Sequence, residues 1–327
     1  MKTPSSLLAA AARRGMGRAL ATLALAVALP AHAYPDRPIT IVVPFSAGAG
    51  TDLTARLLAR TMEKHAGRSV VVVNRAGAGG EIGMASVANA APDGYTLSIL
   101  NTPNVLTIPI ERRAQFSLSS FDVVANIVDD PGTLSVRGNS PLRGVQDLVE
   151  AARKAPGTLT YGTAGVGSAG HISMLLLEQA AGIQLRHVPF KGTADVATAL
   201  LGGHIDIATA NLGEALGFSK GKQWRILGQM APSRSPMAAD LPTFAEAGYP
   251  IESGSLRGLG APRGTPPETL KALSDLVDKA INDPEFRQAA KGAEQNVRYL
   301  PRDDYSSLLT GMQGRFEKLW AASPWNQ

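Results

Sequence analysis

Two glycine-rich turns carry residue types that can bind an anion. Residues 47–52 read Ala-Gly-Ala-Gly-Thr-Asp, and residues 164–168 repeat the pattern as Ala-Gly-Val-Gly-Ser. Glycine lets the backbone approach a ligand closely, and the N-terminus of a helix presents unpaired N–H groups and the positive end of its dipole. A pair of such turns predicts a site that holds one small anion from opposite sides.

The composition of these turns favours a carboxylate as the anion. Neither turn contains Lys or Arg, and each carries a hydroxyl side chain, Thr51 or Ser168, close to the start of a helical pattern. The anion is therefore expected to be neutralised mainly by backbone N–H groups and helix dipoles. Each dipole contributes roughly 0.3–1 kcal/mol.

The same order of elements surrounds both turns. Residues 39–45 and 159–161 read as apolar strands before the glycines, and residues 53–65 and 171–181 read as helices after them. Further strands are expected at residues 70–73, 95–100, 123–128, 133–136, 185–188, 205–210, 224–230 and 256–261. Because continuous apolar strands alternate with helices, we expect a parallel sheet covered on both faces, with the ligand beyond the carboxyl ends of the strands.

The chain is expected to form two α/β domains. Residues 104–121 interrupt the alternation and contain Pro109, so an irregular segment is expected there, followed by a domain boundary near Gly132. If the tail packs on the first domain, the chain crosses between the domains twice, and two crossings make a hinge. The predicted parts are a signal peptide over residues 1–33, a first domain over 34–132 and 252–327, and a second domain over 133–251.

The first residues have the pattern of an export signal. Residues 1–18 carry four basic side chains and no acidic one, residues 19–29 are almost wholly apolar, and Ala31-His32-Ala33 matches a cleavage site. The apolar run is about half the roughly 20 residues of a membrane span. We therefore expect a periplasmic protein that begins at Tyr34, and Arg13-Arg14 leaves the export route open between Sec and Tat.

Composition excludes several classes of function. The chain has 32 Lys and Arg against 27 Asp and Glu, and four of the basic residues leave with the signal peptide, so the remainder is nearly balanced in charge. Aromatic residues are 5% of the chain, and no basic patch with aromatics occurs, which argues against nucleic acid. Cysteine is absent, and the five histidines lack metal-ligand spacing, so we expect no metal and no cofactor.

Two enzymatic interpretations of the second turn remain weaker than ligand binding. Gly165-x-Gly167-x-x-Gly170 matches a dinucleotide fingerprint, but residues 184–191 lack the acid that this fingerprint requires. Ser168 has Val166 where a hydrolase nucleophile turn has its first glycine. An exported α/β hydrolase using Ser168, His171 and Asp195 stays an alternative, as does the ligand-binding component of a sensory system.

Several sequence blocks together resemble one family, the tripartite tricarboxylate transporter solute receptors, also called Bug periplasmic binding proteins. The blocks are Val43-Pro-Phe45 with Gly48 to Asp52, Asn74-Arg-Ala-Gly-Ala-Gly-Gly80-x-Ile-Gly83, Pro92-Asp-Gly-Tyr-Thr96, Tyr161-Gly-Thr-Ala-Gly-x-Gly-Ser168, His187-Val-Pro-Phe-Lys-Gly192, Gly202-Gly-x-x-Asp206 and Leu241-Pro-Thr-x-x-Glu246-x-Gly248. The resemblance implies an α/β periplasmic binding protein of the Venus-flytrap kind, type II-like, with two hinge crossings. It also implies a receptor, not an enzyme.

The resemblance further implies partners and a ligand site. The partners are a small carboxylate, whose identity the sequence leaves open, and the permease subunits of a tripartite tricarboxylate-type transporter. A monomer without nucleic acid is expected. The implied ligand-binding residues are Phe45, Ala47, Gly48, Ala49, Gly50, Thr51, Asp52, Asn101, Thr163, Ala164, Gly165, Gly167, Ser168, His171, Lys191, Gly192 and Asp206. Two departures from the family pattern stand out: Ala49-Gly50 replaces the usual Gly-Ser, and Arg257 falls where an aromatic residue is common.

Overall fold

The structure is a computed structural model that describes residues 34–45, 47–48, 50–190, 192–221 and 223–325. The predicted signal peptide, residues 1–33, lies outside these ranges, as do the predicted site residues Ala49 and Lys191. None of the helices within the described ranges combines the length and the apolar character needed to cross a membrane.

The strands are short except for two near the middle of the sheet. They are β1 (Ile39–Val43), β2 (Val70–Asn74), β3 (Thr96–Asn101), β4 (Phe121–Arg137), β5 (Thr160–Thr163), β6 (Arg186–Pro189), β7 (Ile207–Asn211), β8 (Trp224–Gln229), β9 (Gly254–Pro262) and β10 (Val297–Pro301). The long strands are β4, with 17 residues, and β9, with nine.

Helices connect most of these strands. The α-helices are α2 (Gly50–Ala66), α3 (Glu81–Ala88), α4 (Asn104–Glu111), α5 (Val145–Lys154), α6 (Ala169–Ala181), α7 (Thr193–Leu201), α8 (Leu212–Ser219), α9 (Pro267–Asn282), α10 (Pro284–Gly292) and α11 (Arg302–Ala322). Three short 3₁₀ segments within the described ranges are η1 (Ala78–Gly80), η2 (Leu118–Ser120) and η3 (Pro236–Ala238).

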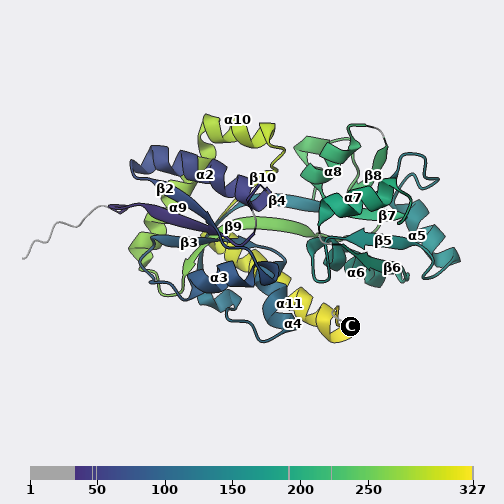
Figure 1. The fold of residues 1–327 in the computed structure, drawn as a ribbon, viewed down its shortest axis with the longest axis horizontal. Coiled ribbons are helices and arrows are strands. Elements are labelled where there is room, and N and C mark those ends of the chain that lie inside the picture. Colours follow the sequence, from purple (N-terminus) through teal and green to yellow (C-terminus); the bar gives the residue numbers. More distant parts are fainter. Residues whose placement is uncertain (1–33, 46, 49, 191, 222, 326–327) are drawn as a thin grey trace, which may run out of the picture. The chain divides into compact units, whose positions relative to one another are not determined.

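The described strands form one mixed sheet in the order β2-β1-β3-β9-β4-β7-β5-β6, and β8 and β10 also pair with β4 (Figure 1). β1 is parallel to β2 and β3, and β5 is parallel to β6 and β7. β9 and β4 run antiparallel to their neighbours. The expectation of a parallel sheet is therefore wrong. The two central strands, β4 and β9, are antiparallel to each other and to the strands on either side of them.

β4 exchanges its partners at the predicted domain boundary. Its pairing with β9 ends at Pro131 opposite Gly254, and its pairing with β7 begins at Gly132 opposite Asn211. The N–H of Gly132 donates to Ser253 O at 2.7 Å, so the outgoing and returning chains are hydrogen-bonded here. The sequence predicted two strands over this stretch, whereas the structure has a single strand that continues through Gly132.

We call β1, β2, β3, β9, β10 and the first part of β4 the first half of the sheet, and β5 to β8 with the last part of β4 the second half. In the first half, α2 packs with α9 and α10, whereas α4 packs with α3 and α11 (Figure 1). In the second half, α5 and α6 share one buried apolar cluster, and α7 and α8 share another. The division into two domains stays a prediction that this arrangement supports.

One helix lies where the sequence predicted an irregular segment. α4 includes Pro109, which lacks the N–H that a helix interior uses. Val105, Leu106 and Ile108 of this helix are buried in the apolar cluster that also contains residues of α11. Burial against α11 therefore outweighs the poor helix propensity of Pro109, a tertiary effect that local sequence does not reveal.

Candidate functional site

A cavity of about 550 Å³ is lined by residues from both halves of the sheet, within the size range of small-molecule sites. Its walls come from the start of α2, the end of β3, the turn between β5 and α6, the starts of α7 and α8, and β9. The lining residues are Phe45, Gly50, Thr51, Gly79, Asn101, Asn104, Ala164, Val166, Ser168, Ala169, Gly170, Gly192, Thr193, Thr209, Ala210, Asn211, Glu214, Ser255 and Arg257.

Asp52 is hydrogen-bonded to the first glycine-rich turn and does not line the cavity. Its carboxylate accepts hydrogen bonds from Gly48 N at 2.8 Å, from Arg56 Nε at 2.9 Å and from Asn74 Nδ2 at 2.9 Å. Burial alone would raise the pKa of Asp52, but these hydrogen bonds outweigh it and hold the pKa below its usual value. Asp52 is thus a positioning residue that fixes the start of α2.

Gly50, the first residue of α2, lies close to a cationic side chain from β9. A Cβ atom placed on Gly50 would lie 2.9 Å from Nη2 of Arg257, which is closer than real Cβ contacts. Beside it, Thr51 Oγ1 donates to Asn101 Oδ1 at 2.9 Å and ties α2 to the end of β3. The glycine therefore leaves room at a helix N-terminus that faces a guanidinium group.

The second turn is held together by its own hydroxyl groups. Ser168 Oγ donates to Gly165 O at 2.7 Å and accepts from His171 N at 3.4 Å, so Ser168 caps α6. Thr163 Oγ1 donates to Gly165 O at 3.0 Å. Gly165 and Gly167 have φ values of 117° and 70°, a region that glycine adopts without strain.

Two stacked histidine rings, His171 and His187, contact the second turn. Nδ1 of His171 accepts a hydrogen bond from Gly167 N at 3.1 Å, so the ring is neutral. The His187 ring stacks on it with centroids 3.9 Å apart, and His187 Nε2 lies 2.7 Å from Thr163 Oγ1. Burial, and then the neighbouring His187, lower the pKa of His171 to about 3.

The neutral His171 predicts a pH dependence of stability. Its folded pKa lies below the value near 6.5 of an unfolded histidine, so the unfolded state binds the extra proton at intermediate pH. Stability is therefore expected to fall as pH is lowered from about 6.5 towards 3, by up to about 1.4 kcal/mol per pH unit. His171→Leu removes the contribution of this histidine to the pH dependence. It also leaves the Gly167 N–H without its hydrogen-bond acceptor. Urea unfolding at pH 7.5, 6 and 5 measures both effects.

The exposed His204 provides the matched control for this experiment. His204→Leu should retain the pH dependence of the unmodified protein. His187, whose pKa burial also lowers, should leave a residual slope in His171→Leu. An unchanged slope in the His171 variant would contradict the assignment of a buried neutral ring.

The C-terminal segment lies beside the second turn. Trp325 Nε1 donates to Glu111 Oε1 at 3.1 Å, and the Trp325 ring makes an edge contact with Trp320 at 4.6 Å between centroids. A Cβ atom on Gly167 would lie 3.3 Å from Glu111 Oε1 and 3.6 Å from Trp325 Nε1. The second turn thus touches residues of α4 and of the tail that follows α11.

Arg257 is a cavity residue whose role sequence reasoning missed. Its Nη2 donates to Asp130 Oδ2 at 2.9 Å and its Nη1 to Gln295 Oε1 at 3.2 Å, and both charged side chains of the pair are about 5% exposed. The prediction that backbone N–H groups and helix dipoles are the main groups to neutralise the anion did not include this guanidinium, whose charge is paired with Asp130. The arginine at position 257, where an aromatic residue is common in the family, is a sequence signal that could have pointed to this cavity residue.

Glu214 is the second cavity residue that was missed. It lies in the first turn of α8, directly after β7, and its Oε2 accepts from Asn211 N at 3.3 Å and from Thr193 Oγ1 at 3.4 Å. Surrounding protein raises the pKa of Glu214, and the nearby Asp130 adds to the rise. The signal that points to Glu214 is its place beyond the carboxyl end of a predicted strand.

The predicted site residues separate into three groups and one further residue, Asp206. Those that line the cavity are Phe45, Gly50, Thr51, Asn101, Ala164, Ser168 and Gly192. Those in or behind the two turns that do not line it are Ala47, Gly48, Asp52, Thr163, Gly165, Gly167 and His171. Ala49 and Lys191 lie outside the described residues.

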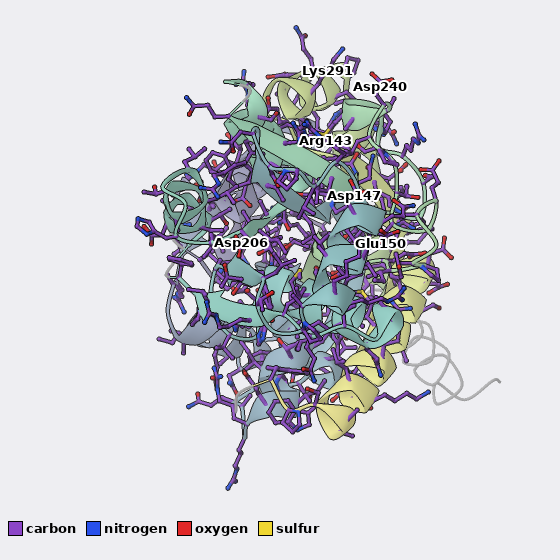
Figure 2. The ribbon with its side chains drawn as sticks, turned by 90° about the vertical axis from the view of Figure 1, so that its right-hand side faces the viewer. Arg143, Asp147, Glu150, Asp206, Asp240 and Lys291 are labelled. Atoms are coloured by element: carbon purple, nitrogen blue, oxygen red, sulfur yellow. The ribbon has the colours of Figure 1, made fainter. Side chains whose placement is uncertain are left out.

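The remaining predicted residue, Asp206, does not reach the cavity. Its Oδ2 accepts from Thr160 N at 2.9 Å and from Thr160 Oγ1 at 2.8 Å, at the start of β5, whereas the second turn follows the end of that strand. Figure 2 labels Asp206 in a view from the right-hand end of Figure 1. The placement of Asp206 in the pocket wall is therefore corrected: it pairs strands at the opposite end of β5.

The described residues contain neither a metal cluster nor an assembled triad. No three His, Asp or Glu side chains in this part of the chain gather so as to hold a metal ion. Ser168 Oγ bonds to Gly165 O, while His171 Nδ1 is occupied by Gly167 N. Asp195 is exposed in the first turn of α7. The contacts of these side chains are those of turn-forming residues.

Comparison with known proteins gives consistent matches. The sequence model of the family described as "Tripartite tricarboxylate transporter family receptor" matches residues 54–320. The "UPF0065 protein in gbd 5'region" of Cupriavidus necator is 33% identical over 302 residues, which are 91% of each chain. A TctC solute binding protein from Polaromonas superimposes with a TM-score of 0.79 at 30% identity, over 88% of this chain and 99% of that one. Rpa4515 of R. palustris, solved with adipate, superimposes with a TM-score of 0.76 at 32% identity. The match covers 88% of this chain and 97% of that one.

The fold is that of a binding protein, and its candidate site is a cavity lined by residues from both halves of the sheet. The chain belongs to the tripartite tricarboxylate transporter receptor family. Proteins of this family are periplasmic solute-binding receptors and not enzymes.

Proposed function

We propose that this protein captures a small carboxylate between two domains in the periplasm and presents it to the permease subunits of a tripartite tricarboxylate-type transporter. The observation that carries the proposal is the shared cavity, where the first residues of α2 and the first residues of α6 face the same space. Helix N-termini favour anions through their free N–H groups and dipoles. The guanidinium of Arg257 adds a positive group beside Gly50.

The mechanism in this proposal is hinge closure on the ligand. The first domain comprises residues 34–132 and 252–327, and the second comprises residues 133–251. β4 and the return at Ser253 and Gly254 are the two crossings, and a ligand that contacts both domains selects the closed arrangement. The adipate in the R. palustris relative supports a carboxylate as the ligand. Export through the predicted signal peptide of residues 1–33 and a monomeric state complete the proposal.

Gly50→Val tests the proposed site. The valine side chain would fill the space between the start of α2 and the Arg257 guanidinium, so the affinity for a carboxylate is expected to fall at least about tenfold. A thermal-shift screen of mono-, di- and tricarboxylates and amino acids finds the ligand, since about 100 times the dissociation constant adds about 2.7 kcal/mol of stability. Calorimetry then compares the variant with the unmodified protein.

Gly311→Ala is the matched control, because Gly311 is exposed on α11 and a Cβ atom there meets nothing within 4 Å. This control should bind normally. Unchanged affinity in Gly50→Val would exclude the site at α2. Hydrolysis of an ester or amide by the purified protein, abolished by Ser168→Ala, would favour the hydrolase alternative instead.

A further inference from the structure

The positive charge in the cavity wall is already compensated by the protein. Arg257 is paired with Asp130 at 2.9 Å, and both side chains are about 5% exposed, so solvent screens the pair little. The guanidinium nevertheless keeps an unused donor: its Nε is buried and has no hydrogen-bond partner among the described residues. Because this Nε is enclosed by protein and the guanidinium is paired, Arg257 adds no uncompensated charge to the cavity.

Glu214 supplies an acceptor oxygen that forms no hydrogen bond among the described residues. Its side chain is exposed to the solvent of the cavity, and its Oε2 accepts the two hydrogen bonds from Asn211 N and Thr193 Oγ1. Within the described part of the chain, no donor contacts Oε1. Together with the Arg257–Asp130 pair, an ionised Glu214 makes this wall of the cavity net negative.

The cavity therefore has two chemically different regions. The starts of α2 and α6 favour an anionic oxygen, because their free N–H groups face the cavity. The start of α8, with the open Oε1 of Glu214 and with Asp130 behind it, favours a positive donor and disfavours a second carboxylate. A ligand that satisfies both regions carries one charge of each sign.

We propose that the ligand is an amino-carboxylate, whose carboxylate lies at the starts of α2 and α6 and whose ammonium group is bound by the carboxylate of Glu214. This inference rests on the proposed function and narrows its ligand. The raised pKa of Glu214 agrees with it: although the side chain is exposed by accessible surface, the protein around it and the charge of Asp130 disfavour the ionised carboxylate until a cation lies beside it. The adipate bound by the R. palustris relative is a dicarboxylate, so the two proteins would differ in the class of ligand.

Length-matched pairs of ligands test this inference by calorimetry at pH 7.5. The pairs are 3-aminopropanoate with succinate, 4-aminobutanoate with glutarate, and 5-aminopentanoate with adipate, which differ only in an ammonium against a second carboxylate. In at least one pair the amino-carboxylate should bind about tenfold or more tightly, which corresponds to about 1.4 kcal/mol.

Glu214→Gln isolates the charge, because glutamine keeps the size and an acceptor oxygen. It should weaken the amino-carboxylate about tenfold or more and leave the dicarboxylate equal or tighter. Asp195→Asn, an exposed acid in the first turn of the neighbouring α7, is the matched control and should change neither affinity. The melting temperature of each variant without ligand verifies that it is folded.

The outcomes separate this inference from the proposed function. Tighter binding of the dicarboxylate in every pair, or an unchanged preference in Glu214→Gln, overturns the amino-carboxylate assignment and leaves a carboxylate receptor in place. Affinity for a dicarboxylate that rises at lower pH would show that Glu214 acts as a protonated donor, and it would also overturn the assignment. If neither series nor any other carboxylate binds, the proposed function itself fails.

Discussion

Asp130→Ala is expected to lower the free energy of unfolding by about 3–5 kcal/mol, the usual cost of removing one partner of a buried ion pair. The substitution leaves the guanidinium of Arg257, about 5% exposed, without its carboxylate. Gln295 is a neutral partner at 3.2 Å and cannot compensate the charge. Chemical denaturation monitored by circular dichroism gives the difference directly.

Two further variants make this result specific. Asp130→Ala combined with Arg257→Met should be more stable than Asp130→Ala alone, because no buried charge is left unpaired. Asp275→Ala breaks the exposed pair between Asp275 and Lys271 and should cost at most about 1 kcal/mol. Equal stability of the Asp130 and Asp275 variants would mean that the buried pair contributes no more than a surface one.

Gly254→Ala is expected to lower the free energy of unfolding by about 3 kcal/mol or more, since overpacking and backbone strain each cost about 1–3 kcal/mol. A Cβ atom on Gly254 would lie 2.4 Å from Asp130 O and 2.7 Å from both Gly132 N and Pro131 Cα. These are backbone atoms, which cannot rotate away. The φ of 152° at Gly254 is also one that L-residues rarely adopt.

Gly264→Ala separates strain from steric clash. Gly264 has a φ of 89°, but a Cβ atom there meets nothing within 4 Å, so this variant should lose only about 1 kcal/mol. The melting temperature and the urea midpoint of the two variants measure the difference. A loss in Gly254→Ala no larger than in Gly264→Ala would show that the crossing strands tolerate separation at this point.

Local pattern predicted the repeated units of the fold and missed its long-range parts. The strand, turn and helix around each glycine-rich turn were predicted, because apolar runs and helical spacing are local properties. α10, which Asp283 caps by accepting a hydrogen bond from Glu285 N at 2.9 Å, and the short β10 were not predicted. Among the described strands, β10 pairs with β4, which lies far away in the chain, so no local pattern reveals this pairing.

The candidate site shows the same division. The two turns were found because their glycines precede helices, and seven of the predicted residues do line the cavity. Arg257 and Asp130 are 127 residues apart in sequence, so no local pattern relates them. Glu214 likewise meets Thr193 only because the fold brings the first turns of α7 and α8 together. Charges that are far apart in the chain therefore determine the character of the cavity, and only the fold reveals them.

The position of Trp325 has a practical consequence for watching this protein work. Indole emission depends on the polarity and the hydrogen bonding of the surroundings, and this indole lies between Glu111 and the second turn. Trp320 contacts it, and the third tryptophan of the chain, Trp224, is equally buried but belongs to a different apolar cluster with residues of α7 and α8. The protein thus carries its own optical reporter, Trp325, beside the second turn, and Trp224 in a separate apolar cluster serves as an internal reference.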